Sequence, residues 1–196
     1  VGGAAALEWR KASGRASADG AGDALRAAYL ETDPAKRAAA FEAVATSAPE
    51  AAVLASLAEA GSLADAGRKD EAAALLARLA DDPMTPALYR ALASLQRVIL
   101  LGAAMDPTER RATIESLAAE GAPFRPLALE QRAFLMLETG DKAAALADFD
   151  SILGLPDAPE QLVSRTRQLI VAAGGALPGA ISAPASEPGA TSVSGG

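Results

Sequence analysis

The stretch Asp33-Pro34-Ala35-Lys36-Arg37, followed by Phe41, recurs 73 residues later as Asp106-Pro107-Thr108-Glu109-Arg110, followed by Ile114. A second, independent set of residues has the same separation and consists of the pairs Gly67 and Gly140, Ala72 and Ala145, Leu76 and Phe149, and Pro83 and Pro156. One period that covers both sets indicates an internal duplication. Self-similarity at a fixed spacing is typical of helical repeat proteins, in which stacked units share a core.

The residues that interrupt the amphipathic runs divide the chain into units of two helices. Asp33, Gly67, Asp106 and Gly140 are 34, 39 and 34 residues apart, which is the length of a two-helix repeat. The apolar spacing and these interruptions predict helices at 23–31, 34–46, 50–66, 69–80, 86–103, 107–119, 126–139, 142–153 and 159–173.

The ends of these helices carry the expected residue types. Asp33, Thr85 and Asp106 each precede a proline at a first-turn position, and we predict that all three are N-caps. Gly67 and Gly140 fall where a helix must stop and a positive φ is useful. On the helix at 50–66, helical spacing predicts a core face made of Leu54, Leu57, Ala58, Gly61 and Ala64.

The composition predicts an all-α protein without catalytic chemistry. The chain is 51% hydrophobic but only 4% aromatic, and its abundant alanine, leucine, arginine and glutamate are good helix formers. The lack of histidine and cysteine removes histidine bases, cysteine nucleophiles, thiolate zinc sites and disulfides. No catalytic residue, metal, cofactor or small-molecule substrate is therefore expected. The net charge of −7 argues against nucleic acid as a partner.

Composition also divides the chain into three parts. Residues 23–173 carry the helical pattern and form the predicted domain. Residues 174–196 are dominated by glycine, alanine, proline and serine, which predicts a disordered tail. Residues 1–22 are interpreted as the end of an N-terminal membrane anchor, Val1–Leu7, and a linker, because Trp9 and charged residues follow the apolar stretch as at a membrane interface. The alternative is the frayed end of a soluble helix.

Two of the predicted units resemble tetratricopeptide repeats. In Gly140-Asp141-Lys142-Ala143-Ala144-Ala145, with Phe149 and Pro156 behind it, glycine, alanine, large apolar residue and proline stand at the spacing of that family. The unit at Gly67 resembles it nearly as well, whereas the units at Asp33 and Asp106 have Asp-Pro in place of the glycine. The resemblance implies a right-handed solenoid of about four helix pairs with a C-terminal capping helix.

The stretch from about 23 to 173 also resembles the periplasmic part of the YfgM-like ancillary subunits of the bacterial SecYEG translocon, in their alphaproteobacterial form. The residues that carry this resemblance are Ala28-Tyr29-Leu30 followed by 34–41, the stretch 121–128, and the alanine- and proline-rich tail. The resemblance implies a domain tethered to the bacterial inner membrane by an N-terminal transmembrane helix. It implies a position on the periplasmic side, with translocon subunits and a periplasmic chaperone as protein partners.

In such solenoids the first helix of each pair lines the concave surface, so polar and aromatic residues on those helices are the candidates for partner contact. They are Tyr89, Arg90, Gln96, Arg97, Glu130, Gln131 and Arg132. The alternative is that Tyr89 packs in the core and that the arginines are solvated or pair with carboxylates.

These observations predict a non-enzymatic scaffold that binds a partner protein or an unfolded client along a curved groove while tethered to the membrane. The alternative is a soluble structural or assembly subunit of a larger complex, with Val1–Leu7 buried against a neighbour. A small-molecule enzyme is a weaker third hypothesis, because it would need a pocket lined by carboxylates or lysine.

Overall fold

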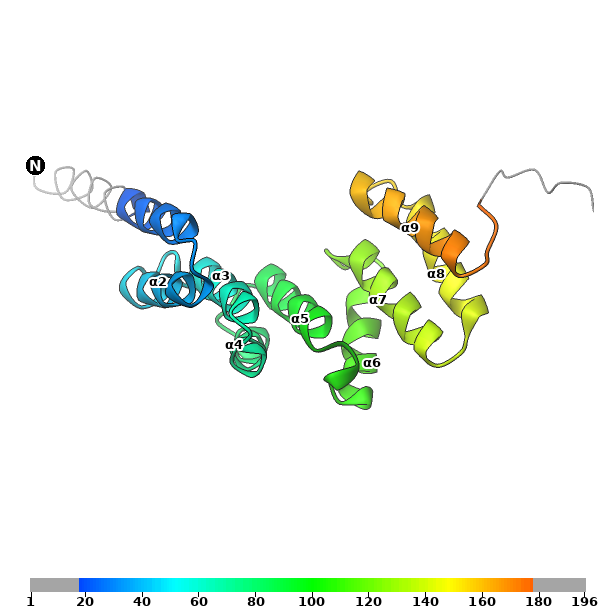
Figure 1. Cartoon of the computed structure of the whole chain (residues 1–196), viewed down its shortest axis with the longest axis horizontal. Coiled ribbons are helices and arrows are strands. Elements are labelled where there is room, and N and C mark those ends of the chain that lie inside the picture. Colours follow the sequence, from blue (N-terminus) through cyan, green and yellow to red (C-terminus); the bar gives the residue numbers. More distant parts are fainter. Residues whose placement is uncertain (1–17, 178–196) are drawn as a thin grey trace, which may run out of the picture.

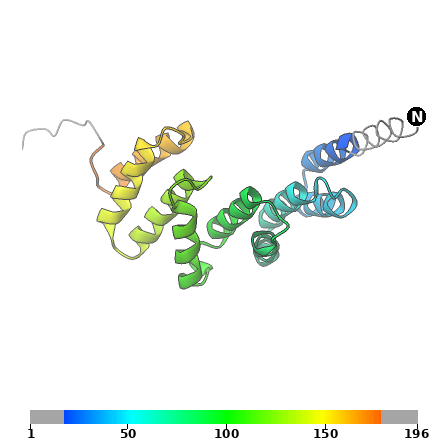
Figure 2. The ribbon, with the colours of Figure 1, turned by 180° about the vertical axis from the view of Figure 1, so that it is seen from behind.

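The computed structural model describes residues 18–177, and every regular element in that range is a helix, which confirms the all-α prediction. After a helix at 18–30, the elements are α2 (Pro34–Ser47), α3 (Ala52–Asp65), α4 (Lys69–Asp81), α5 (Ala87–Leu101), η1 (Gly102–Ala104), α6 (Pro107–Ala118), α7 (Arg125–Glu138), α8 (Lys142–Gly154) and α9 (Glu160–Ala172). The helices follow one another along an elongated molecule (Figure 1). Seen from behind, α8 and α9 again lie at the end opposite the N-terminal helix (Figure 2).

The helix boundaries repeat with the spacing found in the sequence. Helices α2 to α5 begin at Pro34, Ala52, Lys69 and Ala87, and helices α6 to α9 begin 73 residues later at Pro107, Arg125, Lys142 and Glu160. We therefore call 34–101 the first half and 107–172 the second half, and we call two residues equivalent when they are 73 positions apart. Each helix of the first half thus has an equivalent helix in the second half.

Two of the three predicted N-caps are confirmed. The Asp33 carboxylate accepts one first-turn amide at 2.9 Å, and the Asp106 carboxylate accepts two at 2.9 and 3.0 Å. The prediction for Thr85 is wrong, because Pro86 occupies the N-cap position of α5 and no side chain caps that helix. The Thr85 side chain is buried instead and donates to the Asp82 carboxylate at 3.4 Å.

The helices pack mainly on their neighbours in sequence. Each helix from α2 to α9 contacts the next one, and α3, α5, α7 and α9 also contact one another in that order. These four helices therefore form a continuous row. Helices α4, α6 and α8 each pack against two successive helices of that row.

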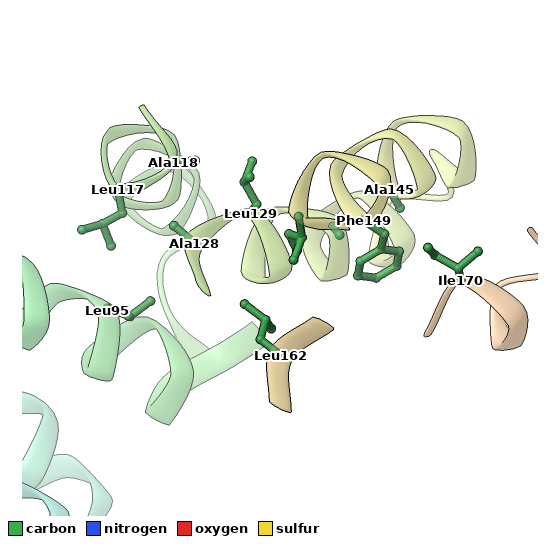
Figure 3. Close-up of a cluster of buried hydrophobic side chains, with 11 residues drawn as sticks. Leu95, Leu117, Ala118, Ala128, Leu129, Ala145, Phe149, Leu162 and Ile170 are labelled. Carbon is green, nitrogen blue, oxygen red and sulfur yellow. The ribbon is translucent and has the colours of Figure 1, made fainter. Parts of the chain in front are cut away.

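The core is a succession of clusters along this row. Figure 3 shows the cluster of the second half, in which side chains from five helices converge: Leu95 of α5, Leu117 and Ala118 of α6, Ala128 and Leu129 of α7, Ala145 and Phe149 of α8, and Leu162 and Ile170 of α9. Ala128 and Ala145 have no exposed surface, so α7 and α8 can approach closely there. A separate cluster holds α2, α3, α4 and α5 of the first half together.

Two of the predicted domain boundaries differ from the structure. Residues 18–22, interpreted as linker, are already helical, and buried Ala21 packs in a cluster with Val44, Ala51 and Ala55. The stretch 174–177, assigned to the disordered tail, is ordered. The Gly175 amide donates to a carbonyl of α9 at 2.8 Å, and residue 177 packs against the core cluster of the second half. The anchor predicted at 1–7 and the tail from 178 onward lie outside the described residues.

The predicted core face of α3 is wrong for two of its five residues. Leu57 is buried, but Leu54 is 47% exposed and Gly61 is also exposed. The helix buries Ala55, Ala60 and Leu63 instead. Gly61, which helical spacing assigned to the core, therefore lies at the surface of the first half.

One helical stretch among the described residues, Ala87–Ala104, is long and apolar enough to cross a membrane by length and composition, with a mean hydropathy of 1.2. Its residues Ala93, Leu95 and Val98 are buried, and α5 packs against α4 and α6. Helices in the core of soluble proteins meet the same criterion, so the stretch is weak support for a membrane span.

Candidate functional site

An apolar groove opens between α3, α4 and α5, with a volume of about 280 Å³. Its walls are Ala60, Gly61, Ala64, Leu76, Gln96, Ile99 and Leu100. Only one of these side chains, that of Gln96, is polar. A concave apolar surface with few polar groups is the usual form of a binding site.

Small residues on α3 keep the groove open. Gly61 lies inside the helix, where glycine costs about 1 kcal/mol relative to alanine. A Cβ atom built on Gly61 would meet no heavy atom within 4 Å, so the glycine is not required by close packing. Across the groove Ile99 of α5 is 53% exposed. The first half therefore presents apolar surface to solvent at this place.

The second half fills the equivalent space with its own side chains. Phe134 is equivalent to Gly61, and it packs edge-on against Phe149 of α8 with ring centroids 6.2 Å apart. Phe149 is in turn equivalent to Leu76 of the groove. Phe134 packs against the core cluster of the second half. The open groove is thus a feature of the first half.

A second cavity of about 280 Å³, with polar walls, lies between α2, α3 and α4. Its charged residues are Glu42, Glu59, Arg68, Glu71 and Arg78. Burial raises the pKa of the Glu59 carboxyl above its ordinary value and the Glu42 carboxylate adds to the rise, while Arg78 and Arg68 oppose it. Arg68 and Glu71 form an exposed ion pair at 2.5 Å.

In the second half an ion pair takes the place of this polar cavity. Arg132, equivalent to Glu59, donates to both Asp148 carboxylate oxygens at 2.6 and 2.9 Å. Asp148 is 7% exposed and is equivalent to Leu75 of the first half. The hydrogen bonds to Asp148, more than the charge of that residue, raise the pKa of Arg132 above its ordinary value, so the guanidinium stays charged.

The structure places the predicted contact residues of α5 in different environments. Gln96 lines the apolar groove. Tyr89 is partly buried and packs against the core cluster of the first half. Arg90 donates to the Thr85 carbonyl at 2.5 Å. Arg97 forms an ion pair with Glu109 of α6. Of these four candidates, Gln96 lines the apolar groove, and Arg90 lines a separate groove between α4, α5 and α6.

The predicted contact residues of α7 are largely engaged within the protein. Glu130 is 4% exposed and accepts two hydrogen bonds from Arg165 of α9 at 2.6 and 2.8 Å. Arg132 holds Asp148, and Gln131 is partly buried. A role of these three residues in partner contact stays a prediction, and the structure gives Glu130 and Arg132 an intramolecular one.

The groove residues Gly61, Ala64 and Ile99 were not among the predicted contact residues. The 73-residue period contained the relevant signal, because it aligns Gly61 with Phe134 and Ala64 with Leu137. A glycine aligned with an aromatic residue in a duplicated core marks a place where only one copy is filled. Among residues 18–177, no group of three or more acidic side chains is arranged to hold a metal ion.

The apolar groove can bind an apolar side chain by removing it from water, and it carries no reactive group.

No family model, curated protein or solved structure matches this chain.

Proposed function

We propose that the chain is a non-enzymatic scaffold that binds a partner polypeptide, and that the groove between α3 and α5 is part of the binding surface. The observation that carries this proposal is the exposed apolar wall of the groove, with Ile99 on one side and Gly61 on the other. Exposed apolar surface in a concave setting marks an interaction site more often than a scattered exposed side chain does.

We further propose that the helices form a right-handed solenoid of tetratricopeptide-like pairs, capped by α9. The contacts from α3 through α5 and α7 to α9 support a stack in which each unit touches its neighbours. The recurrence of the helix starts at a spacing of 73 residues supports units of two pairs. The position of α9 at the end of the row of helices supports a capping role, and its exposed residues include Arg167 and Gln168 as well as the apolar Val171, which is 58% exposed.

The proposed setting is the periplasmic side of the bacterial inner membrane, near the Sec translocon and periplasmic chaperones. The support is the resemblance of 23–173 to YfgM-like translocon subunits and the apolar stretch Val1–Leu7. Tethering would raise the effective concentration of the groove near a membrane partner, so that weak contacts suffice.

A soluble structural subunit of a larger complex is the second candidate. Tyr29 and Leu30, at the end of the first described helix, are 67% and 74% exposed. Two adjacent exposed side chains of this kind fit a permanent contact with a neighbouring subunit, and the Tyr29 ring also packs edge-on against Phe41 with ring centroids 4.8 Å apart.

The deciding experiment is purification of the full-length, membrane-extracted protein after mild crosslinking, with mass spectrometry of the co-purifying proteins. Translocon subunits or a periplasmic chaperone, lost when the predicted anchor 1–7 and any preceding segment are removed, are expected for the tethered scaffold. Recovery of one stoichiometric soluble complex without translocon components would favour the structural subunit. Recovery of no partner at all would contradict both.

A further inference from the structure

We infer that the groove between α3 and α5 binds an aromatic side chain of a partner polypeptide, in the space that Phe134 fills in the second half. This inference rests on the proposed function and adds the chemistry of the partner. It starts from equivalent positions in the two halves, since the chain itself contains both the open and the filled form of the same helix arrangement.

The filled form identifies the group that suits the site. In the second half an aromatic ring from α7 covers the side chain of α8, with the rings of Phe134 and Phe149 nearly perpendicular at 73°. In the first half Leu76 occupies the place of Phe149, and Gly61 supplies no covering group. An aromatic ring brought from outside would cover the exposed Ile99 side chain and lie against Leu76, which is itself 2% exposed at the floor of the groove. Aromatic side chains bury the most apolar surface per residue and often anchor interfaces.

The polar group at the groove suits a peptide. Gln96 is partly buried, and no hydrogen bond of its side chain occurs among residues 18–177. Its amide offers both a donor and an acceptor, which matches the N–H and C=O groups of a peptide backbone next to the bound ring. Because the remaining walls are apolar, the inserted side chain is uncharged.

Charge determines what lies beside the aromatic residue. Asp65, directly after Ala64 of the groove, is paired with Arg37 at 2.5 Å, so the charge that acts on a partner is the net charge of the chain, −7. A partner segment that carries lysine or arginine next to its aromatic residue therefore complements the surface, and charge complementarity speeds association and selects the partner. The residues after 177 contain no aromatic side chain, so the tail of this chain does not supply the ring.

The test uses the whole chain with labelled methyl groups and the synthetic peptide Lys-Ser-Ala-Phe-Ala-Ser-Lys as the probe. The titration extends to peptide concentrations at which binding with a dissociation constant of about 1 mM is detected by NMR. We expect shifts of the Leu76, Ile99 and Leu100 methyl signals with this peptide. The same peptide with serine in place of phenylalanine should cause none. Absence of shifts with both peptides, or shifts spread over the second half, would overturn the inference.

Variants connect the shifts to the groove. Gly61→Phe places the second-half residue in the first half and should weaken binding about tenfold or more. Gly22→Phe is the matched control, because Gly22 is also an exposed helical glycine with no atom within 4 Å of a built Cβ, and it should leave binding unchanged. Ile99→Ser removes an exposed wall residue and should weaken binding even if Gly61→Phe alters the fold. Equal binding by all three variants would overturn the inference.

Two further outcomes separate this inference from the proposed function. If the full-length protein recovers a partner and Gly61→Phe recovers it equally well, the groove inference fails and the scaffold stands. If wild-type protein recovers no partner, the scaffold fails, whatever the peptide titration gives. Self-association in sedimentation experiments that Gly61→Phe abolishes would identify a second copy as the occupant and overturn the inference.

Discussion

The two halves of the molecule begin their helices at equivalent residues but fill the interior between them differently. The first half leaves the space at Gly61 open, and the second half fills it with Phe134. Helix positions in a stacked fold depend on boundaries and small residues at crossings, which the halves share, so the contents of individual sites are free to differ. One copy can then serve stability while the other keeps a surface for binding.

The two halves also differ in how their odd-numbered helices contact each other. The contact between α3 and α5 in the first half is equivalent to the contact between α7 and α9 in the second half. The first half has leucines at the two positions: Leu57 is buried in the core cluster, and Leu92 packs against that cluster. The second half has Glu130 and Arg165 there, joined by two hydrogen bonds at 2.6 and 2.8 Å. An apolar contact and an ion pair with one buried partner, Glu130, therefore occupy equivalent places.

A third position is shared. Arg37 and Arg110 each end the duplicated Asp-Pro motif, and each reaches the last residue of the following odd-numbered helix, Asp65 or Glu138, at 2.5 Å. The hydrogen bonds from Arg110 hold the pKa of Glu138 below its ordinary value. The same arginine–carboxylate ion pair therefore recurs at equivalent positions in the two halves, as the helix boundaries do.

The surroundings of these two arginines differ at the position of Ser62. The Arg37 Nε atom donates to the Ser62 hydroxyl at 3.1 Å. The equivalent of Ser62 is Leu135, and the Arg110 Nε atom is buried with no hydrogen-bond partner among the described residues. The second half thus gains apolar burial at the cost of an unpaired donor.

The largest expected effect tests whether the two halves share their closest helix contact. Ala72 and Ala145 are equivalent and have no exposed surface, so a glutamate at either position would be a buried, unpaired charge. Ala72→Glu and Ala145→Glu should each lower the free energy of unfolding by about 4 kcal/mol, measured by urea denaturation. Exposed Ala143→Glu is the control and should change it little. A near-normal midpoint for either buried variant would show that the crossings are not equivalent.

The next largest effect is expected when the ion pair between Glu130 and Arg165 is replaced by the leucines found at the equivalent positions of the first half. Arg165→Met leaves Glu130, whose side chain is 5% exposed, without its partner and should cost about 2 kcal/mol, reduced because Arg165 is 52% exposed. Glu130→Leu combined with Arg165→Leu installs the first-half residues and should restore wild-type stability. Thermal melts of the single and double variants measure this recovery. A double variant as unstable as Arg165→Met would mean that the halves differ in backbone spacing too.

A smaller effect concerns one buried hydroxyl. Thr166 has no exposed surface, and its Oγ1 atom has no hydrogen-bond partner among the described residues, whereas the equivalent Ala93 has no polar side-chain atom. Thr166→Val keeps the shape and removes the unpaired group, so it should stabilise the protein by about 1 kcal/mol. Thr32→Val, at an exposed site, should have no such effect in the same denaturation series. Destabilisation by Thr166→Val would indicate that the hydroxyl has an unseen partner.

The smallest effect depends on pH. The raised pKa of Glu59 means that its charged form is less favourable in the folded protein than in the unfolded chain, where the ordinary value is 4.5. Wild-type protein therefore loses stability as the pH rises through this pKa. Glu59→Gln should be more stable than wild type at pH 7, and the difference should vanish as the pH falls below 4.5. Exposed Glu50→Gln serves as the control in melts across this range, and a pH-independent difference for Glu59→Gln would contradict the interpretation.

The sequence predicted the helices well because local chemistry determines their ends. Aspartate before proline starts α2 and α6, and Gly67 and Gly140 follow α3 and α7 with positive φ. The Thr85 prediction failed because that side chain is buried and donates to the nearby Asp82 carboxylate instead. Residues 18–22 are helical despite two glycines because Ala21 packs against Val44 and its cluster.

The candidate site was less predictable because it depends on which face each helix turns to its neighbour. Helical spacing alone assigned Gly61 and Leu54 to the core, although α3 buries Ala60 and Leu63. An alanine-rich helix has a weak apolar asymmetry, so rotation by one residue changes the pattern little. The ion pairs of the charged residues on α7 were the hardest to predict from local sequence, since the partner of Glu130 is 35 residues away on α9.

The row of contacts between helices close in sequence has a consequence for biogenesis. Chains whose contacts are mostly local fold quickly, and growing chains fold their N-terminal parts first. Helices α2 to α5 have their own cluster of buried side chains, so they can pack while α6 to α9 are still being made. The second half then adds to an existing surface, one helix at a time, and the apolar groove is complete before the C-terminal residues emerge.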